Sequence, residues 1–306
     1  MIHIFILNPC AGRQNFSEEL RKKLESFEKL NYYIFNTRNS GHETELVRKI
    51  LKIFSDESIR IYCCGGSGTM CNIMNGIDDF SSVELAFYPC GLTNDFLKVF
   101  EDDYDKFRNI ENLINGEVIL IDYIKTNHGV ALNTFSVGLD SNLTENLIDY
   151  RFMSVFGKGL PYLMAFLNAT FFTKPDNYEI YVDEQKFEGS MSQLCFGNGN
   201  YIGGIMNMTD DANIWDGKAS YLIGPPKGGA RLLPLVNHMI KRRIDKLRAV
   251  TTNGKCEQLT IKRIDGQPFQ INLDGEMQPA QKEWTARIIN KGLKFVIPKG
   301  VNVIDR

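Results

Sequence analysis

The segment Ile59–Thr69, IRIYCCGGSGT, decides the fold, because an apolar run ends there in a glycine-rich turn. Residues Ile59–Cys63 predict a buried strand, and the apolar positions in Met70–Met74 predict a short helix after the turn. Two other turns, Asn8–Gly12 (NPCAG) and Pro89–Asp95 (PCGLTND), also follow apolar runs and precede helical patterns. Because parallel strands end at one edge of a sheet, we expect the three turns to lie together where open α/β sheets bind ligands.

Strands and helices alternate on both sides of this segment as far as residue 122. The further strands are Ile2–Leu7, Tyr32–Phe35 and Leu85–Tyr88, and the amphipathic helices are Phe16–Leu30 and Leu46–Phe54. This alternation predicts an N-terminal parallel α/β nucleotide-binding domain over residues 1–122, with right-handed crossovers and helices on both faces.

The pattern changes in residues 123–306, where short alternating runs separated by turn residues predict an antiparallel β-sandwich domain. Two helical pieces, near 143–172 and 229–248, interrupt the strands. The tail after Pro298 either stays with this domain or returns to the first. The expected strands are Ile119–Ile124, Val130–Val137, Tyr178–Val182, Gln193–Phe196, Ala219–Ile223, Gln258–Ile264, Phe269–Leu273 and Leu293–Ile297.

Composition narrows the class of protein. A length of 306 residues favours two domains, and a net charge of −2 argues against a nucleic-acid partner. The longest apolar stretch, Leu160–Phe172, is shorter than the roughly 20 residues of a membrane span, and Met1–Leu7 lacks a signal-peptide pattern. Seven cysteines without C-x-x-C spacing indicate reduced thiols and no zinc site. We therefore expect a cytoplasmic protein, at most peripheral to a membrane; a homodimer is compatible with this.

The turn Gly65–Thr69 has the composition of a phosphate cradle. Glycines let backbone amides approach an anion, the following helix adds free N–H groups, and Thr69 adds a hydroxyl. Arg13 is a candidate phosphate cation after the first turn. The alternatives are a tight turn that requires glycine and a solvated arginine.

Taken together, the motifs resemble the diacylglycerol kinase catalytic-domain family, bacterial lipid kinases related to sphingosine kinases. The resemblance extends nearly end to end. It rests on Asn8-Pro9-x-x-Gly12, Thr37 with Ser40-Gly41-His42, Gly65-Gly66-Ser67-Gly68-Thr69, Pro89-x-Gly91-x-x-Asn94-Asp95-Phe96, Asn133-x-x-Ser136-x-Gly138-x-Asp140, Gly197-Asn198-Gly199, Gly203-Gly204, Asp216-Gly217 and Leu273-Asp274-Gly275-Glu276.

The resemblance implies ATP-dependent phosphorylation of a lipid hydroxyl, such as that of diacylglycerol, with ATP and Mg²⁺ in a cleft between the domains. It implies Glu276 as the general base with Asp274 beside it, although Asp-Gly also predicts a hairpin turn. It further implies a structural magnesium at Asp216, with backbone oxygens near Asn213 and Lys218, where the alternative is a simple turn. The implied nucleotide contacts are Asn8, Gly12, Arg13, Thr37, Gly65, Gly66, Ser67, Gly68, Thr69, Asn94 and Asp95.

Three departures from the family pattern fall in the nucleotide and metal site. Ser67 stands in place of an aspartate, Cys71-Asn72 in place of Asn-Glu, and Leu92 in place of a threonine. They leave two alternatives open. One is a catalytically impaired nucleotide- or lipid-binding homologue, and the other is a kinase of a soluble substrate such as NAD.

Two segments bear on a lipid substrate at a membrane surface. The apolar residues between Phe152 and Phe172, which include Val155 and Phe156, could line an acyl pocket, or they belong to the core. The basic stretch Arg231–Arg248 could rest on anionic headgroups, or it is a solvated face.

Overall fold

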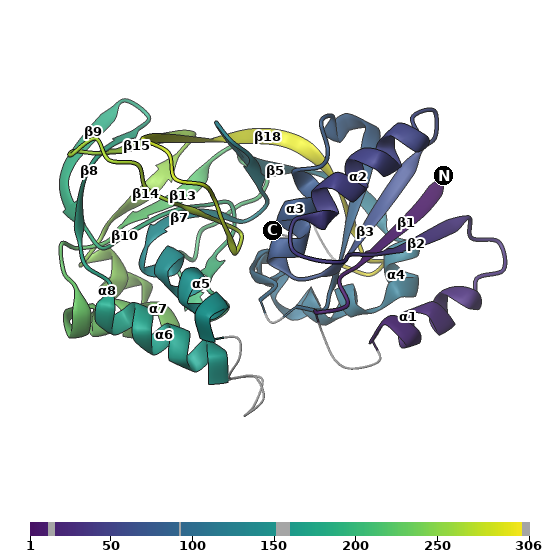
Figure 1. Cartoon of the computed structure of the whole chain (residues 1–306), viewed down its shortest axis with the longest axis horizontal. Helices are drawn as coiled ribbons and strands as arrows, with labels where there is room; N and C mark the ends of the chain where they lie inside the picture. The colour runs from purple at the N-terminus through teal and green to yellow at the C-terminus, as the bar shows by residue number, and fades with distance from the viewer. Residues whose placement is uncertain (12–15, 92, 151–159, 302–306) are drawn as a thin grey trace. The chain divides into compact units, whose positions relative to one another are not determined.

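The computed structural model describes residues 1–11, 16–91, 93–150 and 160–301 (Figure 1). The predictions for Gly12, Arg13, Leu92, Phe152, Val155 and Phe156 lie outside these residues. The chain divides into two compact units, Met1–Tyr123 with Asn290–Arg306, and Ile124–Ile289. The predicted fold class, parallel α/β followed by antiparallel β, is confirmed.

The first unit is built on a parallel sheet with the strand order β2-β1-β3-β4-β18. Its strands are β1 (Ile2–Leu7), β2 (Tyr32–Asn36), β3 (Ile59–Gly65), β4 (Val83–Pro89) and the end of β18 (Glu283–Ile297). Every residue of β1 and β3 is buried, as expected for strands covered on both faces.

Helices and 3₁₀ segments complete the first unit. They are α1 (Phe16–Glu25), α2 (His42–Ile53), α3 (Ser67–Met74), η1 (Phe80–Ser82), η2 (Asp95–Arg108) and α4 (Ile110–Ile114). The order β2-β1-β3 reverses direction after β2, so right-handed crossovers place α1 and α2 on opposite faces of the sheet (Figure 1). The prediction that the first helix reaches Leu30 was wrong. The chain beyond Glu25 makes single i to i−3 turns at Phe27 and Leu30 instead.

The second unit contains two antiparallel sheets, with the strand orders β14-β13-β10-β7-β16-β17 and β18-β15-β8-β9. Their strands are β7 (Thr134–Gly138), β8 (Asp176–Val182), β9 (Gln185–Met191), β10 (Gln193–Gly197), β13 (Ala219–Ile223), β14 (Thr252–Cys256), β15 (Gln258–Arg263), β16 (Asn272–Leu273) and β17 (Glu276–Met277). Also present are β6 (Val130–Ala131), β11 (Tyr201–Ile202) and β12 (Met206–Asn207), while β5 (Glu117–Thr126) lies in the first unit up to Tyr123.

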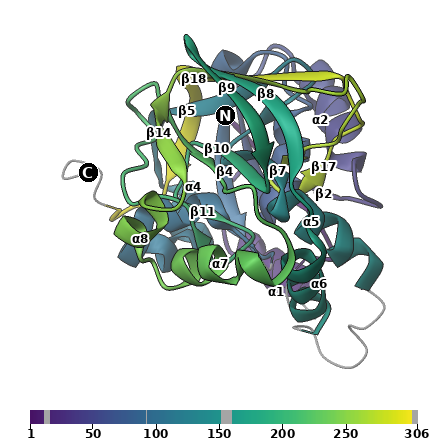
Figure 2. The same cartoon turned by 90° about the vertical axis from the view of Figure 1, so that its left-hand side faces the viewer.

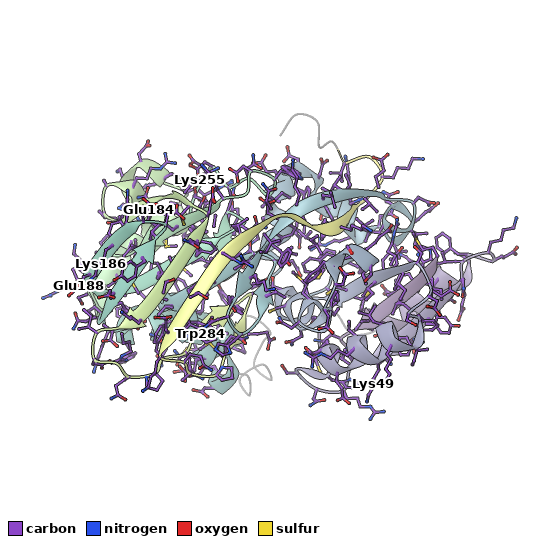
Figure 3. The ribbon with its side chains drawn as sticks, turned by 90° about the horizontal axis from the view of Figure 1, so that it is seen from above. Lys49, Glu184, Lys186, Glu188, Lys255 and Trp284 are labelled. Carbon is purple, nitrogen blue, oxygen red and sulfur yellow. The ribbon has the colours of Figure 1, made fainter. Side chains whose placement is uncertain are left out.

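Sequence patterns missed β9, β14, the first half of β18 and the two-residue strands β11, β12 and β17. Strands β9 and β14 are the outer strands of their sheets, and most of their residues are at least partly exposed, so they lack an apolar alternation. The exposed side of β9 carries ion pairs instead, with Lys186 contacting Glu179 and Glu188 (Figure 3).

The two sheets of the second unit pack against each other through aromatic side chains. Phe135 of β7 meets Trp284 of β18, and Phe187 of β9 meets Tyr221 of β13. Trp284, labelled in Figure 3, is fully buried and donates its ring N–H to the Phe269 carbonyl at 3.2 Å. The predicted sandwich therefore has a continuous core between its sheets.

Helices cover the other side of the sheet that contains β10 and β13 (Figure 2). They are α5 (Leu139–Asp149), α6 (Leu160–Phe172), η4 (Gly229–Leu232), α7 (Leu233–Ile240) and α8 (Ile244–Arg248). Their buried residues form one apolar cluster with Cys195 and Leu222 of the sheet. In the part of the chain described, no helix is long and apolar enough to cross a bilayer.

Candidate functional site

The register of the parallel sheet brings the three glycine-bearing turns to one edge. Leu7 at the end of β1 pairs with Cys64 of β3, and Gly65 pairs with Pro89 at the end of β4. The turns that begin at Asn8, Gly66 and Cys90 therefore leave the sheet side by side. This is the carboxyl edge at which open α/β sheets bind ligands.

Hydrogen bonds join these turns to one another. The Asn8 side-chain amide donates to Thr69 Oγ1 at 2.9 Å, which connects the first turn to the second. The backbone N–H groups of Cys90 and Gly91 donate to the Gly65 carbonyl at 2.8 and 3.0 Å, which connects the second turn to the third. The three turns therefore form a single bonded structure.

Glycine is required where the second and third turns touch. A Cβ atom on Gly91 would lie 2.4 Å from the Gly66 Cα, and one on Gly66 would lie 3.1 Å from the Gly91 Cα. The two backbones thus approach more closely than side chains permit. Helix α3 begins directly after this contact, and the amides of Gly68 and Thr69 in its first turn have no intrahelical acceptor. Such amides, at the positive end of the helix, suit an anion.

Ser67 is buried and ties the second turn to the third. Its hydroxyl donates to the Thr93 carbonyl at 3.2 Å and accepts the Asp95 N–H at 3.3 Å, and its own N–H donates to the Thr93 carbonyl at 3.1 Å. Ser67, which departs from the family pattern, therefore holds the second and third turns together.

The side chains of Asn94 and Asp95 are also buried at this edge. Asp95 forms an ion pair of 2.7 Å with Lys98. The Asn94 amide donates to the Gly91 carbonyl at 3.0 Å and to the Tyr104 hydroxyl at 3.1 Å. Asn94 Oδ1 is buried and finds no hydrogen-bond partner among the described residues. An unsatisfied buried acceptor is costly, so this atom suits a donor supplied by a ligand.

Thr37 lies at the same edge, after β2, but its N–H and its side chain are hydrogen-bonded within the protein. Its N–H donates to the Leu7 carbonyl at 2.8 Å, and its side chain hydrogen-bonds to Glu43 in the first turn of α2. Burial raises the pKa of the Glu43 carboxyl, and hydrogen bonds from the Glu43 backbone, the Thr37 side chain and the Gly41 backbone oppose that shift. Sequence reasoning missed Glu43, although its spacing from Val47 and Ile50 puts it on the buried face of α2.

The acidic motif of the second unit forms a tight hairpin, as the Asp-Gly pair predicts. Strands β16 and β17 pair, and Asp274 and Gly275 between them have φ values of 51° and 93°. Two successive positive φ angles define a type I′ turn. Glu276 follows directly as the first residue of β17 and is half-buried.

Asp274 uses its carboxylate to hold the backbone of the preceding β6–β7 turn. The carboxylate accepts N–H groups from Leu132 at 2.6 Å, from Asn133 at 3.1 Å and from Thr134 at 2.7 Å. The side chain is buried, with 5% of its surface exposed. Three backbone donors hold the carboxylate in place, so Asp274 clamps the β6–β7 turn to the hairpin.

A second buried network holds the other side of the hairpin. Asn272 accepts the Gly275 N–H at 2.7 Å and donates to the Asp140 carboxylate at 2.8 Å, and Asp140 also accepts the Ser136 hydroxyl at 2.5 Å. Asp140 and Ser136 come from the motif that begins at Asn133. The network therefore links that motif to the residue preceding Glu276.

The predicted structural-metal position is occupied by protein groups. Asp216 accepts the Lys218 N–H at 3.0 Å and pairs with the Lys255 ammonium at 2.7 Å (Lys255 is labelled in Figure 3), while Asn213 accepts the Trp215 N–H at 2.9 Å. Within the described residues, no group of three or more His, Cys, Asp or Glu side chains could hold a metal ion. Asp216 and Asn213 therefore each form an Asx turn, and the Lys255 ammonium is the cation that pairs with the Asp216 carboxylate.

Asp122 is a second buried carboxylate, after Glu43, that sequence reasoning missed. Asp122 of β5 is fully buried and accepts the N–H of Lys291, which has a φ of 49°. An acidic residue inside the apolar run Leu120–Ile124 was the signal that could have found it. This hydrogen bond joins β5 to β18 within the first unit, at a residue whose backbone leaves the extended conformation.

Comparisons with known proteins agree with this arrangement. Residues 3–126 match the diacylglycerol kinase catalytic domain. The chain is 23% identical over 278 residues to a diacylglycerol kinase of Bacillus subtilis (strain 168), covering 89% of this chain and 88% of that one. A crystal structure of a diacylglycerol kinase from Bacillus anthracis (strain Sterne) superposes with a TM-score of 0.72 at 19% identity, covering 98% of both chains.

The fold of the whole chain is therefore that of the diacylglycerol kinases. Residues 3–126 are similar in sequence to the catalytic domain of that family, and the whole chain shares the fold of its members.

Proposed function

We propose that this protein is a lipid kinase that transfers the γ-phosphate of ATP to the hydroxyl of a lipid such as diacylglycerol. The observation that carries the proposal is the bonded set of three turns at one sheet edge, with the first turn of α3 among them. The matched domain and the names of the relatives support a kinase.

The first unit supplies the groups that would bind ATP. The amides of Gly68 and Thr69 suit the phosphates, while Gly65 and Gly66 keep the turns close enough for those amides to converge. Asn94 Oδ1 is a buried acceptor that suits an N–H or O–H donor of the nucleotide. Asn8 holds Thr69 in position. Gly12 and Arg13 stay part of the proposal from the motif alone.

The second unit supplies the proton acceptor. We assign Glu276 as the general base that takes the proton from the lipid hydroxyl as its oxygen bonds to the γ-phosphorus and the bond to ADP breaks. Asp274 and Asn272 are positioning residues, since they anchor the hairpin through Leu132–Thr134 and Asp140. This division of tasks follows from the burial of Asp274 and the partial exposure of Glu276.

Magnesium fits the first-unit turns only weakly. Asp95 is the one carboxylate in these three turns, and it is paired with Lys98. Asp95 is the residue that would hold Mg²⁺ here, and the ion would offset the negative charge of the phosphates. The structural magnesium at Asp216, with backbone oxygens near Asn213 and Lys218, stays part of the proposal from the motif alone, and it would displace the Lys255 ammonium from the Asp216 carboxylate.

A second candidate function is a nucleotide- or lipid-binding homologue with little transferase activity. The observation that favours it is the hydroxyl of Ser67, which bonds inward to Thr93 where the family pattern has a carboxylate. The two candidates share the same ATP site and differ in turnover.

The test measures ATP binding and phosphate transfer separately. Titration calorimetry with ATP and Mg²⁺ measures binding, and radiolabelled ATP with dispersed diacylglycerol, sphingosine or NAD measures transfer. We expect binding and transfer to diacylglycerol, with Glu276→Gln losing about 10²-fold or more in kcat while retaining ATP affinity. Glu283→Gln is the matched control on an exposed strand position.

Each other outcome has a defined meaning. ATP binding without transfer to any acceptor would favour the binding homologue. Transfer to NAD alone would support a soluble-substrate kinase. Absence of ATP binding would overturn the kinase and the nucleotide-binding homologue.

A further inference from the structure

Helix α6 of the second unit exposes large apolar side chains. Residues Leu160–Phe172 contain no charged residue. One side is buried through Pro161, Ala165 and Ala169. The exposed fractions on the other side are 51% for Leu163, 40% for Leu167 and 44% for Phe171, and Phe172 at the C-terminal end of the helix is 72% exposed. A surface helix usually places polar residues there, so this face indicates an interaction site.

An apolar groove runs along this face of α6. It has a volume of about 480 Å³ and is lined by Tyr150, Met164, Leu167, Asn168, Phe171 and Phe172. The two polar lining side chains satisfy each other, because Asn168 Nδ2 donates to the Tyr150 hydroxyl at 2.8 Å. The groove therefore presents mainly hydrocarbon to whatever enters it.

Basic residues flank the apolar face. The η4 segment packs on the end of α6, where the Gly229 N–H donates to the Thr173 carbonyl at 3.2 Å. Gly229 also lies against the Phe171 carbonyl, so the segment that carries the exposed Lys227, Arg231 and Leu233 runs beside the end of α6. Residues 160–175 carry a single charge, Lys174, and residues 217–244 carry six cations and no carboxylate.

We propose that the exposed face of α6, together with η4 and the start of α7, docks the protein on an anionic lipid bilayer. Leu163, Leu167, Phe171 and Phe172 enter the boundary between headgroups and acyl chains, while Lys174, Lys227 and Arg231 contact headgroup phosphates. The helix lies in the interface. Docking would bring a lipid hydroxyl within reach of the bound ATP. Only this purpose of docking rests on the proposed function.

The charge pattern favours a membrane over a second copy of the chain. In a two-fold symmetric dimer each patch meets an identical patch. Cations would then face cations without a carboxylate from either copy within these segments, which is repulsive. An anionic surface satisfies both the apolar and the basic residues.

The experiment measures vesicle binding of the full chain without ATP or diacylglycerol. Co-sedimentation uses phosphatidylcholine vesicles with and without about a third phosphatidylglycerol. We expect binding to the anionic vesicles that weakens at high salt, and about tenfold or more loss in L163S/F172S. Lys227→Ala with Arg231→Ala should lose about fivefold for each cation.

Matched controls test whether the loss of any exposed apolar or cationic side chain would weaken vesicle binding. The variant I53S/I264S removes two apolar side chains that are 72% and 51% exposed, the same fractions as Phe172 and Leu163. Lys22→Ala with Lys23→Ala removes two exposed cations from α1. Both controls should bind vesicles like the unmodified protein, and melting curves should show that L163S/F172S stays folded.

The outcomes distinguish this inference from the proposed kinase activity. The inference is overturned if the unmodified protein does not bind anionic vesicles, if L163S/F172S binds equally well, or if sedimentation shows only a dimer that L163S/F172S abolishes. Activity on a dispersed short-chain diacylglycerol should be retained in L163S/F172S. Vesicle binding without kinase activity would support docking and refute the kinase.

Discussion

Asp274 and Thr134 bond to each other twice. The Thr134 N–H donates to Asp274 Oδ1 at 2.7 Å, and the Asp274 N–H donates to the Thr134 carbonyl at 3.1 Å. The acidic hairpin is therefore attached to the β6–β7 turn by its backbone as well as by its carboxylate. The hairpin that carries Glu276 has little freedom to move without breaking these bonds.

Replacing Asp274 should destabilise the protein more than it alters substrate binding. Asp274→Ala leaves the buried N–H groups of Leu132, Asn133 and Thr134 without their acceptor, and we expect a loss of about 3 kcal/mol or more in the free energy of unfolding. Urea denaturation measures this quantity. Glu276→Ala on the same hairpin is the control and should cost under about 1 kcal/mol. Equal losses for both would refute the clamping task.

The contact between the second and third turns predicts a graded effect of alanine. Gly91→Ala puts a Cβ atom 2.4 Å from the Gly66 Cα, so the turns must separate, at a cost of about 1–3 kcal/mol. Gly66→Ala meets its nearest neighbour at 3.1 Å and should cost less. Thermal melts and ATP titrations of both variants check this order. The reverse order would show that the turns do not depend on this contact.

Ser67 should limit phosphate transfer if Mg²⁺ acts at the second turn. Ser67→Asp adds a carboxylate beside the bound phosphates, and about 1.4 kcal/mol of added transition-state stabilisation would raise kcat about tenfold. Ser67→Asn has nearly the same size without the charge and should not increase the rate. Steady-state kinetics across Mg²⁺ concentrations measure the difference. Similar rates for both variants would contradict a metal-organising role at this position.

His3 should make stability depend on pH. Burial, with a smaller effect of the Arg60 guanidinium, lowers the pKa of His3 to about 4. Between pH 4 and 6.5 the unfolded chain binds more protons than the folded one, so stability falls as pH falls through this window. The total loss is about 3 kcal/mol.

Urea midpoints across this pH range measure the dependence. His3→Gln should flatten the profile between pH 4 and 6.5, since glutamine does not titrate. An unchanged profile in this variant would assign the pH dependence to other groups.

Several elements could be predicted from the sequence because their signals are local. Buried parallel strands such as β3 are continuous apolar runs, and the glycine turn after β3 marks the strand end and the helix start. The hairpin at Asp274 was predictable because the turn type depends on two adjacent residues. Strands β9 and β14 could not be predicted, because edge strands need no apolar face.

By itself the sequence determined the order of strands, turns and helices, and with it the common edge of the three turns. Only the tertiary structure decided which chemical task each polar residue has. Asp274 and Glu276 look equivalent in the sequence, and they differ because the partners of Asp274 lie 140 to 142 residues away. Ser67 likewise turns toward Thr93 because two backbones meet at glycine. Contacts between residues far apart in the chain depend on tertiary packing, and short sequence patterns cannot predict them.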